Sequence, residues 1–248
     1  VVPNSPRTWL GERGAALHAE MQASYGKGIL ILNKTLDGVR EAFGGPGFRF
    51  APAFALAKTR YGKVRVDPKT GKVKHRTIVN QSKGGAGGEL ALNDWIGPAE
   101  EKIRLGRAVD FGAGVAALQR EYPEERILMS LTDDDCAFPS QPIRWADARW
   151  CGVHIFDPRL PLPAYARERP PTAEEVERDF VYANFTTMTL GARSSMATYC
   201  RLGAAIDFLH QHPDAPVPTP LPAKRFVTER YVDDTAKGAP ESICDAVT

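Results

Sequence analysis

Two groups of adjacent aspartates have the composition of a metal site. Asp133, Asp134 and Asp135 follow the apolar run ILMSLT, and Asp233 and Asp234 follow the strand-like segment RFVTERYV. Carboxylates this close together repel one another, whereas magnesium offsets their charge and keeps coordination positions for phosphate oxygens. Neighbouring strands would bring the two groups together. A pair of magnesium ions there would clamp the attacking and leaving oxygens of a phosphoryl transfer.

Each group also fits a structural role when it is considered alone. The aspartates at 133–135 could cap a helix, and those at 233–234 could form the polar tip of a hairpin. The segments around the two groups therefore decide between a catalytic and a structural role.

The segment around the first group resembles a catalytic motif of reverse transcriptases. TDDDCAF at 132–138, followed by the dipeptide PI at 142–143, has an aspartate four residues before an alanine and an aromatic residue. In the family the aspartate ligates metal, and the aromatic residue lies under the nucleotide sugar and excludes a 2′-hydroxyl. The resemblance assigns these roles to Asp133 and Phe138.

The second group stands in YVDD at 231–234, which is similar to the family's second carboxylate motif. That motif is a hairpin whose first aspartate ligates metal. The resemblance makes Asp233 a catalytic metal ligand and Asp234 its catalytic support, with Asp134 as a further carboxylate at the metal site. It implies two Mg²⁺ ions as cofactors, for which Mn²⁺ can substitute.

Between these motifs, TLGARSSMATYCRL at 189–202 is similar to the family's glycine-containing motif and the helix after it. In the family this element lies under the template and the incoming nucleotide. Gly191 matches the family glycine, which lets the backbone approach a ligand closely. The preceding Thr189-Leu190 departs from the Pro-Phe or Pro-Gln of many relatives. A glycine that only turns the chain before a helix would give the same pattern.

Upstream, FALAK at 54–58 and KHRTIVNQS at 74–82, ending in LND at 92–94, resemble the family's fingers hairpin and the segment that joins it to the palm. Lys58 and Arg76 match the basic residues that hold the triphosphate. A guanidinium forms paired hydrogen bonds to phosphate oxygens and a lysine adds a point charge, so both suit this task. We assign three other lysines of the hairpin to a solvated surface: Lys63, Lys69 and Lys72.

Local sequence patterns predict a mixed α+β chain. Apolar residues at helical spacing predict helices at 10–24, 36–43, 107–121 and 194–212. Alternating or short apolar runs bounded by turn residues predict strands within 48–58, 72–79, 127–132, 180–185 and 225–232. Residues 158–178 are rich in proline and charge, which predicts a surface excursion.

Charge is divided unevenly along the 248 residues. Basic residues exceed acidic ones by nine over residues 1–120, and acidic residues exceed basic ones by seven over residues 121–248. A basic half suits a polyanion, and an acidic half suits divalent cations. Two differently charged solvated surfaces would explain the same distribution.

Composition excludes several classes of protein. No stretch approaches the roughly 20 apolar residues that cross a bilayer, and the N-terminal residues lack a signal pattern, so we expect an intracellular protein of the cytoplasm or nucleus without a membrane partner. The cysteines are too scattered to indicate a zinc site or a disulfide framework: Cys136, Cys151, Cys200 and Cys244.

The resemblance implies an α+β right-hand polymerase core, with an antiparallel palm sheet backed by helices and a basic fingers subdomain. We expect the fingers and a helical lead-in at 1–106 and the palm at 107–248, with a fingers return and proline-rich excursion at about 144–180. A helical thumb and an RNase H domain are expected on a longer parent chain. The expected partners are an RNA or DNA template with its primer and deoxynucleoside triphosphates.

The implied activity is RNA-directed DNA synthesis of the retrotransposon type, and two alternatives remain open. RNA-dependent RNA polymerases use the same palm carboxylates, but they usually need a polar group at the position of Phe138. A catalytically silent domain that binds nucleic acid or another partner would also keep the fold. Primer extension with each nucleotide type separates the three hypotheses.

Overall fold

The computed structural model of the chain has a mixed α+β fold with small antiparallel sheets. It divides into two compact units, Val1–Pro98 with Phe138–Ser195 and Ala99–Ala137 with Met196–Thr248. The structure describes the following residues: 6–45, 47–60, 62–84, 90–96, 107–133, 141–189, 192, 195, 198–205, 227–231 and 234–242.

Short antiparallel strands and helices make up the described part of the first unit. The strands are β1 (Leu30–Asn33), β2 (Ala53–Ala57), β3 (Thr59–Arg60), β4 (Lys63–Val64), β5 (His75–Val79), β7 (Gly152–Phe156) and β8 (Phe180–Phe185). They form a three-stranded sheet in the order β1-β8-β7 and two ribbons, β2-β5 and β3-β4. The helices are η1 (Pro6–Trp9), α1 (Gly11–Gly26), α2 (Leu36–Phe43), α3 (Leu92–Trp95), α5 (Trp145–Ala148), η2 (Ala164–Arg167) and α6 (Ala173–Asp179).

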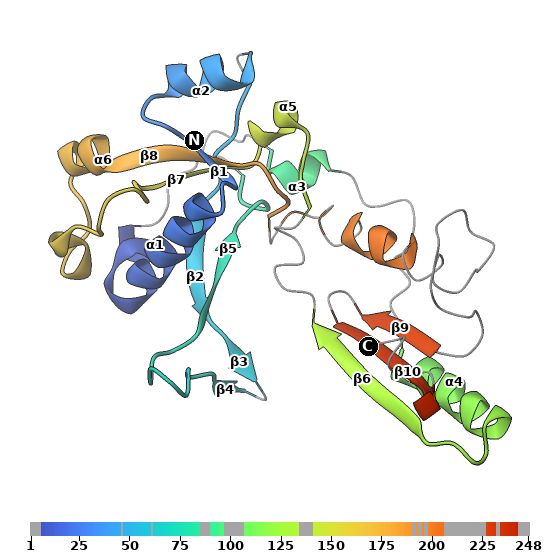
Figure 1. Cartoon of the computed structure of the whole chain (residues 1–248). Helices are drawn as coiled ribbons and strands as arrows, with labels where there is room; N and C mark the ends of the chain where they lie inside the picture. Colours follow the sequence, from blue (N-terminus) through green and yellow to red (C-terminus); the bar gives the residue numbers. More distant parts are fainter. Residues whose placement is uncertain are drawn as a thin grey trace. The chain divides into compact units, whose positions relative to one another are not determined.

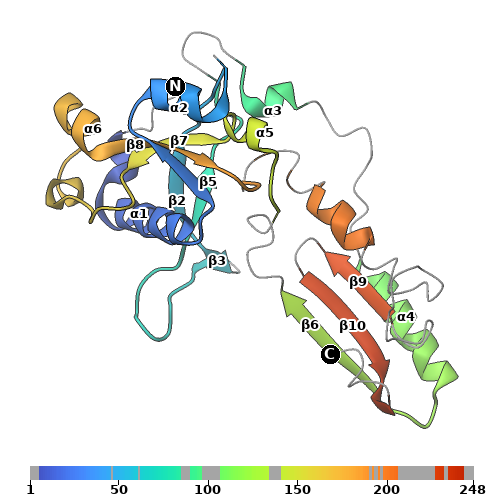
Figure 2. The ribbon, with the colours of Figure 1, turned by 45° about the horizontal axis from the view of Figure 1, so that its top comes forward.

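The β1-β8-β7 sheet is covered on both faces. Helix α1 and the β2-β5 ribbon lie on one side of it, and α2 and α5 lie on the other (Figures 1 and 2). The main core includes the fully buried side chains of Leu17, Met21, Val153, Ile155 and Val181. Burial of each large side chain contributes about 1.5–3 kcal/mol, so this core holds α1 against the sheet.

A second, smaller core forms where Phe50 packs against the sheet. Its ring centroid lies 4.9 Å from that of Tyr182, and its backbone neighbours pair with β7. Ala51 N donates to Gly152 O (2.8 Å), and Gly152 N donates to Arg49 O (3.2 Å). A Cβ at Gly152 would lie 2.5 Å from the Phe50 ring and 2.6 Å from Arg49 O. The close approach of segment 49–51 to β7 therefore requires glycine at this position.

Most residues of the proline-rich segment 158–178 are exposed, as expected of a surface excursion, but a few of its side chains are buried. Helix η2 and most of α6 belong to it, and Ala166 is fully buried. Other side chains of the segment pack against the main core: Leu162, Tyr165 and Val176. The Tyr165 hydroxyl also donates to the Asp179 carboxylate. Apolar residues between the prolines thus dock the segment, which composition alone did not predict.

The second unit is built around one sheet in its described part. Its elements are α4 (Ala108–Glu121), β6 (Ile127–Asp133), β9 (Val227–Tyr231) and β10 (Asp234–Pro240), and residues 198–205 are helical. The antiparallel strands have the order β6-β10-β9. Helix α4 lies along this sheet (Figure 2), and its Leu118 is buried. A small helix-backed antiparallel sheet results.

Most of the predicted local elements are present. The helices expected at 36–43 and 107–121 and the strand expected at 180–185 match α2, α4 and β8. Of the helix expected at 194–212, residues 198–205 are helical in the described part. The α+β class is confirmed. Within the described residues, no helix is long and apolar enough to cross a bilayer.

Candidate functional site

The two sequence motifs with paired aspartates lie on neighbouring strands. Asp133 is the last residue of β6, Asp234 is the first residue of β10, and the two are directly opposite each other in the antiparallel register. The pairing continues without interruption to Ile127 opposite Pro240. Asp234 is also opposite Tyr231, the last residue of the neighbouring antiparallel strand β9.

The structure locates only part of the predicted metal site. The backbones of Asp133 and Asp234 are placed, whereas four other predicted residues lie outside the described part of the chain: Asp134, Phe138, Gly191 and Asp233. Among the side chains that the structure describes, no three from His, Cys, Asp and Glu are grouped closely enough to share a metal ion. The roles of the aspartates therefore stay predictions.

One face of the β6-β10-β9 sheet is open to solvent along β6. The side chains of Met129 and Leu131 are 66% and 72% exposed. On the opposite face, Thr235 and Ala239 of β10 are each 2% exposed. Because successive residues of a strand alternate between faces, Met129 and Leu131 share one face of β6.

The predicted triphosphate-binding residues lie on the β2-β5 ribbon of the first unit. Lys58 follows β2 directly, Arg76 is the second residue of β5, and both side chains are exposed. Arg76 is opposite Leu56, and Lys58 N donates to Lys74 O (2.8 Å). By the alternation of a strand, Lys58 and Arg76 share one face of the ribbon. Both are free to approach an anion from solvent.

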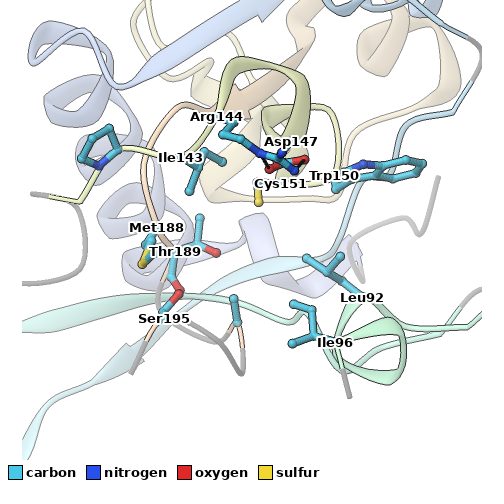
Figure 3. Close-up of a pocket in the computed structure, with 12 residues that line it drawn as sticks. Leu92, Ile96, Ile143, Arg144, Asp147, Trp150, Cys151, Met188, Thr189 and Ser195 are labelled. Carbon is cyan, nitrogen blue, oxygen red and sulfur yellow. Dashed lines mark hydrogen bonds and ion pairs between the residues drawn. The ribbon is translucent and has the colours of Figure 1, made fainter. Parts of the chain in front are cut away.

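A separate cavity of about 440 Å³ lies within the first unit. Its walls are mainly apolar, from Leu92, Ile96, Ile143, Trp150 and Met188, with Thr189 and Ser195 on one side (Figure 3). The Ser195 hydroxyl donates to Thr189 O (3.0 Å), which links two residues of the cavity wall. The sequence alone did not indicate this cavity, because its lining comes from distant segments.

The cavity lacks the features of a thiol-based active site. Burial, and secondarily the negative charge of Asp147, raises the pKa of the Cys151 thiol to about 11. The thiol is therefore protonated at neutral pH and is a poor nucleophile. Asp147 itself is paired with Arg144, with 2.7 Å between Oδ2 and Nε. In its described part, the cavity thus has a mainly apolar wall and no activated thiol.

Comparisons with known proteins add no family to these observations. No protein-family model matches the chain, and a search of curated proteins gives no match. The case for a function therefore depends on the motifs and on the geometry of the two units taken separately.

Proposed function

We propose that this chain is a template-directed DNA polymerase of the reverse-transcriptase type. In this proposal the β6-β10-β9 sheet is the palm, and the β2-β5 ribbon belongs to the fingers. The observation that carries the proposal is the register that sets Asp133 opposite Asp234. Two segments that resemble the family's carboxylate motifs are neighbours in one antiparallel sheet, as a shared metal site requires.

The residues at these positions fit magnesium. Directly opposite residues of an antiparallel pair have Cα atoms about 4.5–5.5 Å apart, so carboxylates at such positions can reach one ion. Like charges directly opposite are otherwise destabilising, and magnesium prefers oxygen ligands of this kind. Asp133 and Asp233 would hold two Mg²⁺ ions, with Asp134 and Asp234 beside them. When bound, the ions would stabilise the charge on the attacking and leaving oxygens.

The remaining residues of the proposed site position the substrates. A primer 3′-hydroxyl attacks the α-phosphate of a deoxynucleotide, a phosphodiester bond forms, and the bond to the leaving pyrophosphate breaks. Lys58 and Arg76 neutralise the triphosphate through charge-assisted hydrogen bonds. Phe138 excludes the 2′-hydroxyl, and Gly191 lets the backbone approach the nucleotide. Catalysis then depends on alignment and charge stabilisation rather than on a covalent intermediate.

Primer extension tests the proposal directly. The protein is incubated with a primed RNA template, Mg²⁺, and either deoxynucleotides or ribonucleotides. We expect template-dependent addition of deoxynucleotides, loss of addition in EDTA, and recovery when Mg²⁺ or Mn²⁺ is restored. Preferential addition of ribonucleotides would identify an RNA polymerase instead. Binding of the primed template without addition of either nucleotide would identify a catalytically silent domain, and both results would overturn the proposal.

A further inference from the structure

The β2-β5 ribbon divides at its distal end into two short hairpins. One is the β3-β4 pair, whose turn contains Gly62 with φ of 75°. The other runs between the bridged residues Val66 and Val73 and turns near Gly71, with φ of 67°. Positive φ favours glycine, so each hairpin has a turn residue suited to it. The ribbon therefore ends in a three-way junction rather than in a single loop.

Three basic residues meet at this junction through a ring of backbone hydrogen bonds. Lys58 N donates to Lys74 O (2.8 Å), Lys74 N donates to Arg65 O (2.9 Å), and Arg65 N donates to Lys58 O (2.8 Å). The registers of the flanking pairs, Thr59 with Val64 and Ala57 with His75, extend to these residues. Each of the three cationic residues is thus directly opposite the other two.

This arrangement concentrates positive charge with little compensation. The segment from Lys58 to Arg76 contains eight basic residues and one acidic residue, Asp67. The Asp67 carboxylate lies 3.7 Å from Lys74 Nζ and also accepts a hydrogen bond from Lys69 N (2.8 Å). Among the described carboxylates, none forms an ion pair with Lys58, Arg65 or Arg76. Directly opposite like charges destabilise a strand pair, so the junction favours an anion.

We propose that Lys58, Arg65 and Lys74, together with Arg76, form a binding site for the phosphate chain of a polyphosphate. Lys74 and Arg76 are two residues apart and share a face of the ribbon, so Arg76 extends the cluster along that face. Two guanidinium groups supply paired hydrogen bonds to phosphate oxygens, and two lysines add point charges. The site rests on the proposed function in one respect only, which is the identification of its ligand as a nucleoside triphosphate. It adds Arg65 and Lys74 to the phosphate-binding residues.

Calorimetric titration with inorganic tripolyphosphate tests the site without any nucleotide addition. We expect the variants Arg65→Ala and Lys74→Ala to bind tripolyphosphate about tenfold more weakly than the unmodified chain, because each loses a charge-assisted hydrogen bond. Lys69→Ala is the matched control, since it removes one positive charge from the same hairpin but outside the junction. We expect it to change the affinity less than about twofold. An equal loss of tripolyphosphate affinity in Lys69→Ala and Arg65→Ala would overturn the proposed site. The absence of tripolyphosphate binding by the unmodified chain would also overturn it.

Titration with a single-stranded DNA oligonucleotide separates the two sources of phosphate. We expect Arg65→Ala to affect tripolyphosphate more than the oligonucleotide. A defect confined to the oligonucleotide would assign the junction to the nucleic-acid backbone and overturn the polyphosphate proposal.

Thermal unfolding at low ionic strength provides a readout that does not require titration. We expect Arg65→Ala to unfold no earlier than the unmodified chain without ligand, since it relieves repulsion. Tripolyphosphate should raise the unfolding temperature of the unmodified chain and of Lys69→Ala. The increase for Arg65→Ala should be much smaller. Equal increases in the unfolding temperature of the unmodified chain and of both variants would contradict the proposal. Tripolyphosphate binding by a chain that adds no nucleotide would leave this site intact while the polymerase proposal failed.

Discussion

Asp133 and Asp234 are directly opposite each other across the β6-β10 pair, although about a hundred residues separate them in sequence. In the sequence, Asp233 immediately precedes Asp234. A metal site built on these positions depends on the register, because a shift by one residue would move one carboxylate to the other face of the sheet. The following predictions test the roles that this geometry and the motifs suggest.

The substitutions Asp133→Asn and Asp233→Asn should each reduce nucleotide addition by about a hundredfold or more. Both remove a charge that would bind metal while they keep the size of the side chain. Primer-extension rates measured with saturating deoxynucleotide and Mg²⁺ check this, with circular dichroism to show that the fold is retained. The control is Asp110→Asn in α4 of the same unit, which changes a surface ion pair with Arg107 and should have little effect. Substantial extension by either folded variant would show that the metal assignment is wrong.

Replacement of Phe138 by Val should raise the use of ribonucleotides relative to deoxynucleotides. A smaller side chain would leave room for a 2′-hydroxyl at the sugar. The measurement is the ratio of kcat/KM for the two nucleotide types, with a conservative Phe138→Tyr variant as the control. An unchanged ratio would mean that the aromatic ring serves only in packing.

The substitutions Lys58→Ala and Arg76→Ala should raise the KM for deoxynucleotides by about tenfold and change the affinity for the primed template much less. Their proposed partner is the triphosphate, and a charge-assisted hydrogen bond contributes roughly this factor. Steady-state kinetics and template binding at several salt concentrations check the two quantities separately. If the main defect were a weaker template affinity with a shallower salt dependence, these residues would instead contact the nucleic-acid backbone.

Two glycines of helix α1 should differ sharply in their tolerance of alanine. A Cβ at Gly14 would lie 2.0 Å from the carbonyl oxygen of Trp9, whereas a Cβ at Gly26 meets nothing within 4 Å. Gly14→Ala should therefore lower the free energy of unfolding by about 1–3 kcal/mol or more, because backbone must shift to accept it. Gly26→Ala should be neutral or slightly stabilising. Urea unfolding of both variants checks the difference, and equal stabilities would contradict the packing of η1 on α1.

The free energy of unfolding should fall as the pH falls from about 6.5 to about 4, partly because of His154. Burial, and secondarily the positive charge of Lys34, lowers the pKa of His154 to about 4, and its ring stacks on Tyr182 at 4.5 Å. The unfolded chain then binds a proton that the folded chain excludes, so stability is lost in this window. Between pH 7 and pH 5 the expected loss from this group is about 2 kcal/mol.

The variant His154→Phe keeps an aromatic ring at this position and removes the titrating group. Urea unfolding at the two pH values should show a smaller loss for the variant than for the unmodified chain. Part of the loss should remain, because burial also lowers the pKa of His18. An identical pH dependence in the two proteins would show that His154 is not held neutral in the folded state.

The sequence by itself determined the local elements and the chemical composition of the candidate site. The helical spacing at 36–43 and the apolar run at 180–185 are properties of short windows, and both gave the observed α2 and β8. The aspartate groups and the basic hairpin could be recognised in the sequence for the same reason. Each of these features depends on residues that are close together along the chain.

Only the tertiary structure decided which distant residues face one another. The register of β6 with β10 sets Asp133 opposite Asp234. In the divided ribbon, backbone hydrogen bonds bring Arg65 opposite Lys58 and Lys74. Strand propensity does not specify a partner or a register, because these follow from packing and pairing between segments far apart in sequence. The docking of Ala166 and its neighbours in the proline-rich segment has the same origin, since burial is decided by the surface that a segment meets.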